Sequence, residues 1–236
     1  MTNYPSGQIF IGVDRRQPLA YSVCRSSIER HAKNRINIEP LMLEKLPIKR
    51  RGLTDFTYSR YLVPWLCDYR GTALFLDADI ILRTDIGELF RLLETQYPIR
   101  HPETSEWTYK PSVCVVKNTK VRFEWPSVMF FHCSECKELT PELIETGNPT
   151  DLGWANFIGE LPKEWNHCVG YDEPDPHAKL VHYTQGIPCW PETKDCEFSK
   201  EWHEEAKYAF GTVSWIELMG SSVHAKPVME RLTKAA

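Results

Sequence analysis

Two aspartates, Asp77 and Asp79, stand one residue apart within the run ALFLDADIIL, residues 73–82. The eight other residues of this run are apolar, as in a strand buried inside a parallel sheet. Burying two like charges costs several kcal/mol unless a positive charge lies between them. Side chains alternate along an extended chain, so both carboxylates are expected on one side of the strand, as a hard oxygen site for Mg²⁺ or Mn²⁺. The alternative is a solvated pair at the end of a strand.

The elements predicted around this pair alternate between strands and helices. Strands are expected over residues 8–14, 36–46 and 71–82, and helices over 18–34, 56–69 and 85–93. Thr54 or Asp55 is expected to cap the helix over 56–69, and Pro64 to kink it. This alternation predicts an α/β fold with a mostly parallel sheet flanked by helices. Ligands of such sheets bind beyond the carboxyl ends of the strands, where the aspartates lie.

The second half of the chain is more broken. Strands are expected over residues 112–116, 127–131 and 179–184. Thr140 and Pro141 predict the start of a short helix that Gly147 ends. Residues 149–191 are rich in loops, which often carry substrate contacts.

Composition limits the class of protein. The 28 basic and 32 acidic residues give a net charge of −4, which argues against a nucleic-acid partner. The 236 residues are 42% hydrophobic, which suits one well-filled domain. The sequence shows no signal-like N-terminal segment and no run long enough to cross a bilayer, so a cytoplasmic protein is expected.

The eight cysteines raise a second question. Cys133 and Cys136 form a CxxC motif beside His132, from which a zinc or redox site could be built, with Cys168 further along. The second closely spaced pair that a zinc site usually needs is missing. Reduced, buried thiols are therefore expected, Cys189 among them.

Phosphatases of the haloacid-dehalogenase class also place a DxD motif after an apolar strand. Their motif usually lies near the N-terminus and is followed by a lysine and a further acidic pair. Here the motif lies a third of the way along the chain, and no DD or GDxxxD sequence follows it. The phosphatase alternative is therefore disfavoured.

Three blocks carry a family resemblance: FTYSRY (56–61), LFLDADIILRTDIGELF (74–90) and VHYTQGIPCW (181–190). In this order they resemble glycosyltransferase family 8, the group of glycogenin and the bacterial lipooligosaccharide galactosyltransferases. The resemblance implies a GT-A nucleotide-diphospho-sugar transferase fold over a single domain, residues 1–236. Its nucleotide-binding half would cover about residues 8–95, and its loop-rich acceptor half about 96–236.

The resemblance also implies which residues form the site. Asp77, Asp79 and His182 would hold Mn²⁺ or Mg²⁺. The donor would contact the two aspartates and the following further residues: Gly12, Val13, Asp14, Arg60, Ala78 and Gly186. Two alternatives stay open: His182 as a satisfied core histidine, and Arg60 in an ion pair on a helix surface.

The implied activity is a metal-dependent, retaining transfer of a hexose from a nucleotide-diphosphate sugar, with a UDP-sugar expected. The acceptor would be a glycan, a lipid-linked saccharide or another small molecule. Retention needs a nucleophile beneath the sugar, for which Asp151 is the candidate, or attack from the face of the leaving group. Trp125, Trp154 and Trp190 could stack on sugars, although buried aromatics are as often core residues.

The sequence departs from the family at three places. Pro188 and Cys189 stand where a lysine usually precedes Pro-Trp, and residues 125–127 (WPS) replace an Asn-x-Gly. Asp151 matches the first residue of an Asp-Gln pair whose glutamine is lost. A domain that binds a nucleotide sugar without turnover therefore remains an alternative. The tail, residues 224–236, is expected to pack as a final helix or to touch a membrane surface or a partner.

Overall fold

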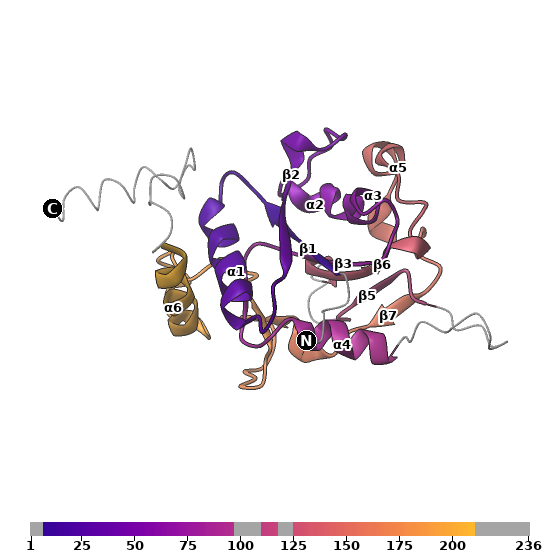
Figure 1. Cartoon of the computed structure of the whole chain (residues 1–236). Helices are drawn as coiled ribbons and strands as arrows, with labels where there is room; N and C mark the ends of the chain where they lie inside the picture. The colour runs from indigo at the N-terminus through magenta and orange to yellow at the C-terminus, as the bar shows by residue number, and fades with distance from the viewer. Residues whose placement is uncertain (1–6, 97–109, 118–124, 211–236) are drawn as a thin grey trace.

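A six-stranded sheet forms the centre of the computed structural model, which describes residues 7–96, 110–117 and 125–210 (Figure 1). Its strand order is β2-β1-β3-β6-β5-β7. The strands are β1 (Gln8–Val13), β2 (Asn37–Met42), β3 (Thr72–Leu76), β5 (Val113–Val115), β6 (Val128–His132) and β7 (Ile158–Glu160). Strand β1 pairs in parallel with β2 and β3, and β5 with β7, whereas β6 is antiparallel to β3 and β5. The predicted α/β class with a mostly parallel sheet is confirmed.

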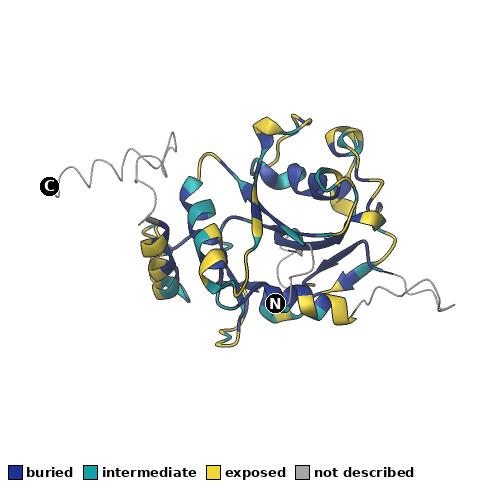
Figure 2. Ribbon diagram, viewed as in Figure 1, coloured by how far each residue is buried: buried dark blue, intermediate teal, exposed yellow. Residues whose placement is uncertain are grey.

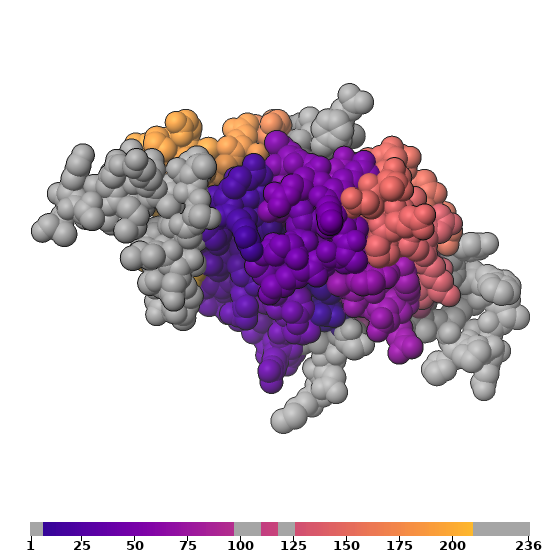
Figure 3. Space-filling view, turned by 90° about the horizontal axis from the view of Figure 1, so that it is seen from above, coloured from indigo at the N-terminus to yellow at the C-terminus, as the bar shows by residue number. Residues whose placement is uncertain are grey.

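Helices cover both faces of this sheet. They are α1 (Pro18–His31), α2 (Phe56–Ser59), α3 (Val63–Leu66), α4 (Gly87–Gln96), α5 (Pro141–Thr146) and α6 (Ser199–Phe210). One core cluster joins the sheet to α1, α4 and α6, and the other joins it to α2, α3 and α5. Buried residues accordingly follow the strands and the inner sides of the helices (Figure 2). Seen from above, α5 and the N-terminal half share one face of the molecule (Figure 3).

Strand β3 explains the apolar run. Leu74 and Leu76 belong to the first core cluster, while Ala73 and Phe75 belong to the second. Successive side chains point to opposite faces of a strand, and both faces of this sheet are covered. Every residue from Ala73 to Leu76 must therefore be apolar.

A second, three-stranded sheet has the order β4-β9-β8. It is formed by β4 (Ile80–Leu82), β8 (His167–Cys168) and β9 (Leu180–His182). The prediction of a single strand over residues 71–82 is therefore wrong, because β3 ends at Leu76 and β4 belongs to the other sheet. The two aspartates lie in the link between the sheets, where the chain changes its hydrogen-bonding partners.

The predicted helix over residues 56–69 is also interrupted. It consists of α2, a 3₁₀ turn over Arg60–Leu62 and α3, and Pro64 lies in the first turn of α3 instead of kinking a longer helix. Neither Thr54 nor Asp55 caps it through its side chain. The Asp55 carboxylate instead lies 3.2 Å from Arg51 Nη1.

Other predicted boundaries are confirmed. Thr140 Oγ1 accepts a hydrogen bond from the Leu143 N–H at 3.2 Å, which caps α5, and Gly147 follows its last residue. Helix α6 was not predicted from the sequence. Its Glu205 accepts hydrogen bonds from Arg30 of α1 at 2.8 and 2.9 Å. The predicted tail over residues 224–236 lies outside the described residues.

All eight cysteines carry free thiols. Cys133 and Cys136 are buried. His132 Nδ1 lies 2.8 Å from the Pro111 carbonyl oxygen, and His132 and the two cysteines do not form a metal-binding cluster among the described residues. Cys189 is exposed, so its prediction as a buried thiol is wrong. Among the described residues, no helix is both long enough and apolar enough to cross a membrane.

The burial of β3 makes a test of the fold possible. Leu74 has no exposed surface, whereas 87% of Leu53 is exposed. Leu74→Ala should lower the free energy of unfolding by about 2–5 kcal/mol, because it removes buried methyl groups and leaves a cavity. Leu53→Ala is the matched control and should change it by less than about 0.5 kcal/mol. Urea unfolding followed by circular dichroism measures both, and equal effects would contradict the assigned burial.

Candidate metal centre

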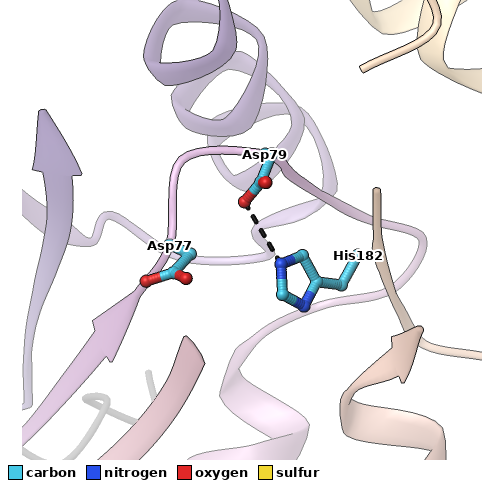
Figure 4. A group of neighbouring side chains, drawn as sticks. All are labelled: Asp77, Asp79 and His182. Atoms are coloured by element: carbon cyan, nitrogen blue, oxygen red, sulfur yellow. Dashed lines mark ion pairs between the residues drawn. The ribbon is translucent and has the colours of Figure 1, made fainter. Parts of the chain in front are cut away.

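Asp77, Asp79 and His182 come together where the two sheets meet. One possible ligand atom from each lies within 4.8 Å of the others. His182 is the last residue of β9, and it pairs with Ile80, the residue that follows Asp79. Figure 4 shows the imidazole ring directed at Asp79, with Asp77 nearby. Of the described residues, only these three form a cluster of His, Cys, Asp or Glu that could hold a metal ion.

The backbone of the link is held from both sheets. The Asp77 N–H donates to the Ser127 carbonyl oxygen at 2.8 Å, just before β6 begins. The Asp79 carbonyl oxygen accepts from the Tyr183 N–H at 2.9 Å, just after β9 ends. The positions of the two aspartates are therefore set by different sheets.

Arg60 lies beside Asp77. Its Nη1 is 3.1 Å from Asp77 Oδ1 and donates to the Pro126 carbonyl oxygen at 2.6 Å. Its Nε donates to the Phe56 carbonyl oxygen at 3.1 Å, and the guanidinium lies 4.9 Å from the centre of the Phe75 ring. Arg60 is buried, so the alternative of an ion pair on a helix surface is wrong. The ion pair exists, but it lies inside the site and already supplies positive charge to Asp77.

His182 is almost completely buried and has polar neighbours at both ring nitrogens. Nε2 lies 3.2 Å from Asp79 Oδ1, and Nδ1 lies 3.2 Å from Asn166 Oδ1. Asn166 Nδ2 donates to Ser127 Oγ at 2.9 Å. Sequence reasoning missed Asn166, and no motif in the sequence marks it.

The residues present fit a divalent cation. Asp79 Oδ1 is buried, yet within the described part of the chain it accepts no hydrogen bond of acceptable geometry. A buried carboxylate oxygen in this state carries a desolvation cost that a bound cation would remove. Two carboxylates and one imidazole suit Mn²⁺ or Mg²⁺, because hard oxygen ligands dominate the set.

The end of β1 lies near the start of α2. Gly12 packs against Phe56 so closely that a Cβ atom would collide with the ring. Val13 is half-buried, and Asp14 is buried. Burial by itself would raise the pKa of Asp14, but hydrogen bonds from the Arg16 side chain and backbone bring the pKa below its usual value.

The remaining predicted donor contacts lie at the link and in the loop after β9. Ala78 is buried between the two aspartates. Gly186 has a φ of +119°, and a Cβ atom there would lie 3.3 Å from the Trp190 ring. This position therefore favours glycine for a structural reason, whatever its contact with a ligand.

Asp151 does not join the three-residue cluster. It is exposed in a 3₁₀ turn over Pro149–Asp151, where its Oδ1 accepts from the Gly153 N–H at 2.9 Å. Burial raises the pKa of Tyr61, and the charges of Asp77 and Asp151 add to this effect, although Arg60 opposes it. Both aspartates therefore lie within electrostatic reach of one buried tyrosine.

The predicted sugar-stacking tryptophans differ in their surroundings. Trp154 is a core residue that meets Tyr61 edge-on, with ring centres 6.3 Å apart. Trp190 is half-buried and packs against the first core cluster. The side chain of Trp125 lies outside the described residues.

Three solved glycosyltransferases have a fold similar to that of this chain. The bifunctional glycosyltransferase WbbM matches with a TM-score of 0.61 and 16% identity, over 94% of this chain and 52% of its own. GlyE of Streptococcus pneumoniae TIGR4 matches with a TM-score of 0.57 and 16% identity, over 90% and 62%. Galactosyltransferase LgtC, solved with donor and acceptor sugar analogues, matches with a TM-score of 0.53 and 11% identity, over 88% and 96%. The chain thus spans about half of WbbM and less than two thirds of GlyE, and its fold is GT-A.

At the level of sequence, no family model matches the chain. Protein CDI of Arabidopsis thaliana is 34% identical to it over 223 residues, which cover 84% of this chain and 85% of that protein. Identity of this extent over more than four fifths of both proteins reflects common descent. The chain therefore belongs to the same family as Protein CDI of Arabidopsis thaliana.

Proposed function

We propose that the chain is a metal-dependent, retaining glycosyltransferase that moves a hexose from a nucleotide-diphosphate sugar, with UDP as the nucleotide, to a glycan, a lipid-linked saccharide or another small acceptor. The observation that carries this proposal is the meeting of Asp77, Asp79 and His182 at the junction of the two sheets. The GT-A fold supports the transfer of a sugar from a nucleotide, and the three sequence blocks support family 8 within that fold. A cytoplasmic location belongs to the same proposal.

Asp77, Asp79 and His182 would hold Mn²⁺ or Mg²⁺ through two oxygens and one nitrogen. At this position a divalent cation would supply stabilisation of the negative charge that develops on a leaving diphosphate. Arg60 adds a buried positive charge 3.1 Å from Asp77 Oδ1 and so favours the ionised carboxylate. Gly12, Val13 and Asp14 would face the nucleotide, together with Ala78 and Gly186.

Asp151 is the proposed nucleophile beneath the sugar. Glycosyl transfer passes through a transition state that resembles an oxocarbenium ion, which a nearby carboxylate stabilises. Asp151 keeps its carboxylate at the surface, in a turn close to Tyr61, and this leaves it accessible to a bound sugar. LgtC was solved with analogues of both donor and acceptor, and we propose that this chain also binds a donor and an acceptor together.

The second candidate function is binding of a nucleotide sugar without turnover. It is favoured by Pro188 and Cys189, which stand where the family usually has a lysine for the diphosphate. The phosphatase alternative has no support from the fold, and its nucleophile would have to be Asp77, whose carboxylate is paired with Arg60. Release of free sugar from a donor would separate the transferase from the binder.

The metal proposal predicts metal-dependent binding of UDP. Titration calorimetry should show UDP binding with Mn²⁺ and its loss with EDTA. Loss of an outer-shell partner of a metal ligand costs about 10–100-fold in affinity, so removal of a ligand charge in Asp79→Asn should cost at least about 100-fold. Asp195→Asn makes the same substitution at an exposed aspartate and should leave the affinity for UDP unchanged.

Two results would contradict this prediction. UDP binding that resists both EDTA and Asp79→Asn would exclude the three-residue cluster as the nucleotide site. Failure to bind UDP under all these conditions would exclude UDP, and the titration would then be repeated with other nucleoside diphosphates.

The role of Asp151 predicts a separate effect on turnover. With Mn²⁺ and a UDP-sugar that the protein hydrolyses, Asp151→Asn should lower kcat by at least about 100-fold, the lower end of what a positioned catalytic group contributes. The affinity for UDP should not change, because Asp151 lies outside the metal cluster. Asp175→Asn is a matched control, since Asp175 also accepts a hydrogen bond from the N–H two residues on. Equal kcat values for the two variants would remove Asp151 from the reaction.

A further inference from the structure

Asn166 occupies a fully buried position beside the candidate metal centre. It lies between a 3₁₀ turn over Lys163–Trp165 and strand β8. Strand β8 runs parallel to β9, with Cys168 opposite His182. Residues two apart on a strand share a face, so Asn166 and His182 are brought to the same side of the small sheet.

The amide of Asn166 has one donor end and one acceptor end, and each meets a different group. Nδ2 donates to Ser127 Oγ at 2.9 Å, which turns Oδ1 toward His182 Nδ1, 3.2 Å away. A carbonyl oxygen can only accept, so Nδ1 must carry the proton of this hydrogen bond. In a neutral imidazole the other nitrogen, Nε2, then carries a lone pair instead of a proton.

The geometry at Asp79 agrees with this assignment. Nε2 lies 3.2 Å from Asp79 Oδ1, yet that oxygen accepts no hydrogen bond from within the described part of the chain. The lone pair of Nε2 and the carboxylate oxygen instead stand side by side. Two ligand atoms that both offer electron pairs are suited to a shared cation.

Asn166 also connects His182 to the other side of the centre. Ser127, which accepts from the Asn166 amide through Oγ, accepts the Asp77 N–H through its carbonyl oxygen. The amide therefore joins β9, which carries His182, to the segment that holds Asp77. A single side chain fixes the orientation of one ligand relative to the backbone of another.

We propose that Asn166 is a positioning residue that holds His182 in the tautomer with the proton on Nδ1, so that Nε2 is presented to a divalent cation between Asp79 and Asp77. This inference rests on the proposed metal site. It adds a residue outside the predicted ligand set, and its first test does not require a metal.

The first test reads the tautomer directly in the metal-free protein. Long-range ¹⁵N–¹H correlation spectra at alkaline pH distinguish a proton on Nδ1 from a proton on Nε2, and His182→Gln assigns the signal. The wild type and Asn166→Asp, which keeps an acceptor toward Nδ1, should both show the Nδ1–H form. Asn166→Leu, of similar shape but without an acceptor, should shift His182 toward the Nε2–H form.

Two variants complete this experiment. Ser127→Ala removes the group that orients the amide and should give a mixture of tautomers. Glu197→Gln is the matched control, because Glu197 lies 2.9 Å from Nε2 of His167, a different histidine of the same small sheet. An Nε2–H tautomer in the wild type would mean that the amide is turned the other way and would overturn the proposal. So would an unchanged tautomer in a folded Asn166→Leu variant.

The second test measures Mn²⁺ affinity in the presence of UDP by electron paramagnetic resonance. Asn166→Leu should weaken Mn²⁺ binding by about 10–100-fold, as expected for an outer-shell partner of a metal-bound histidine, and Asn166→Asp should restore most of it. Unchanged affinity in Asn166→Leu would overturn the proposal. If the wild type binds no Mn²⁺, the proposed function fails, and the tautomer spectra still decide whether Asn166 controls His182.

Discussion

The close approach of two carboxylates to an apolar core is the constraint on which the rest of this structure depends. Asp77 and Asp79 are only half-buried, but the residues on either side of them are completely covered. Charges in such a place need compensation by partners of opposite sign or by strong hydrogen bonds. Arg60 supplies a positive charge to Asp77, whereas His182 stands beside Asp79 without forming a hydrogen bond to its buried oxygen. These two neighbours come from opposite sides of the central sheet, and the fold must bring both to one short link.

The change of sheet after Leu76 is how the fold meets this constraint. If β3 had continued in the central sheet, both aspartates would have stayed between layers of helices. Instead β4 pairs with β9 in antiparallel register, which places His182 opposite Ile80 and next to Asp79. Because side chains alternate with a period of two, a slip of one residue would turn His182 to the opposite face. The position of the imidazole is therefore a consequence of the register of the small sheet.

Local sequence patterns contained much of this fold but not the link. The apolar run over residues 73–82 correctly indicated buried strand, and the aspartates within it do meet His182, as the resemblance implied. The run could not show that it divides between two sheets, because β3 and β4 are both covered on both faces and carry the same pattern. Helix α6 was missed for a different reason. Its buried residues Trp202, Glu205, Ala206 and Ala209 recur at helical spacing, so the local pattern was present but was not interpreted as a helix. Its pairing with α1 is non-local, because Glu205 meets Arg30, 175 residues earlier in the chain. Asn166 depends on the parallel pairing of β8 with β9, which is also non-local.

The departures from glycosyltransferase family 8 can now be divided by what they affect. Residues 125–127 replace an Asn-x-Gly sequence, yet this segment supports the site through main-chain atoms, since Pro126 and Ser127 offer carbonyl oxygens to Arg60 and Asp77. Such support survives a change of side chains. The loss of a lysine at Pro188 and Cys189 is different, because it removes a positive charge that nothing on the main chain replaces. The cluster around Asp77, Asp79 and His182 does not depend on either segment's side chains, apart from the Ser127 hydroxyl that orients Asn166. Under the proposed function, these departures therefore affect the binding of the sugar and of the diphosphate more than the three residues that would hold a cation.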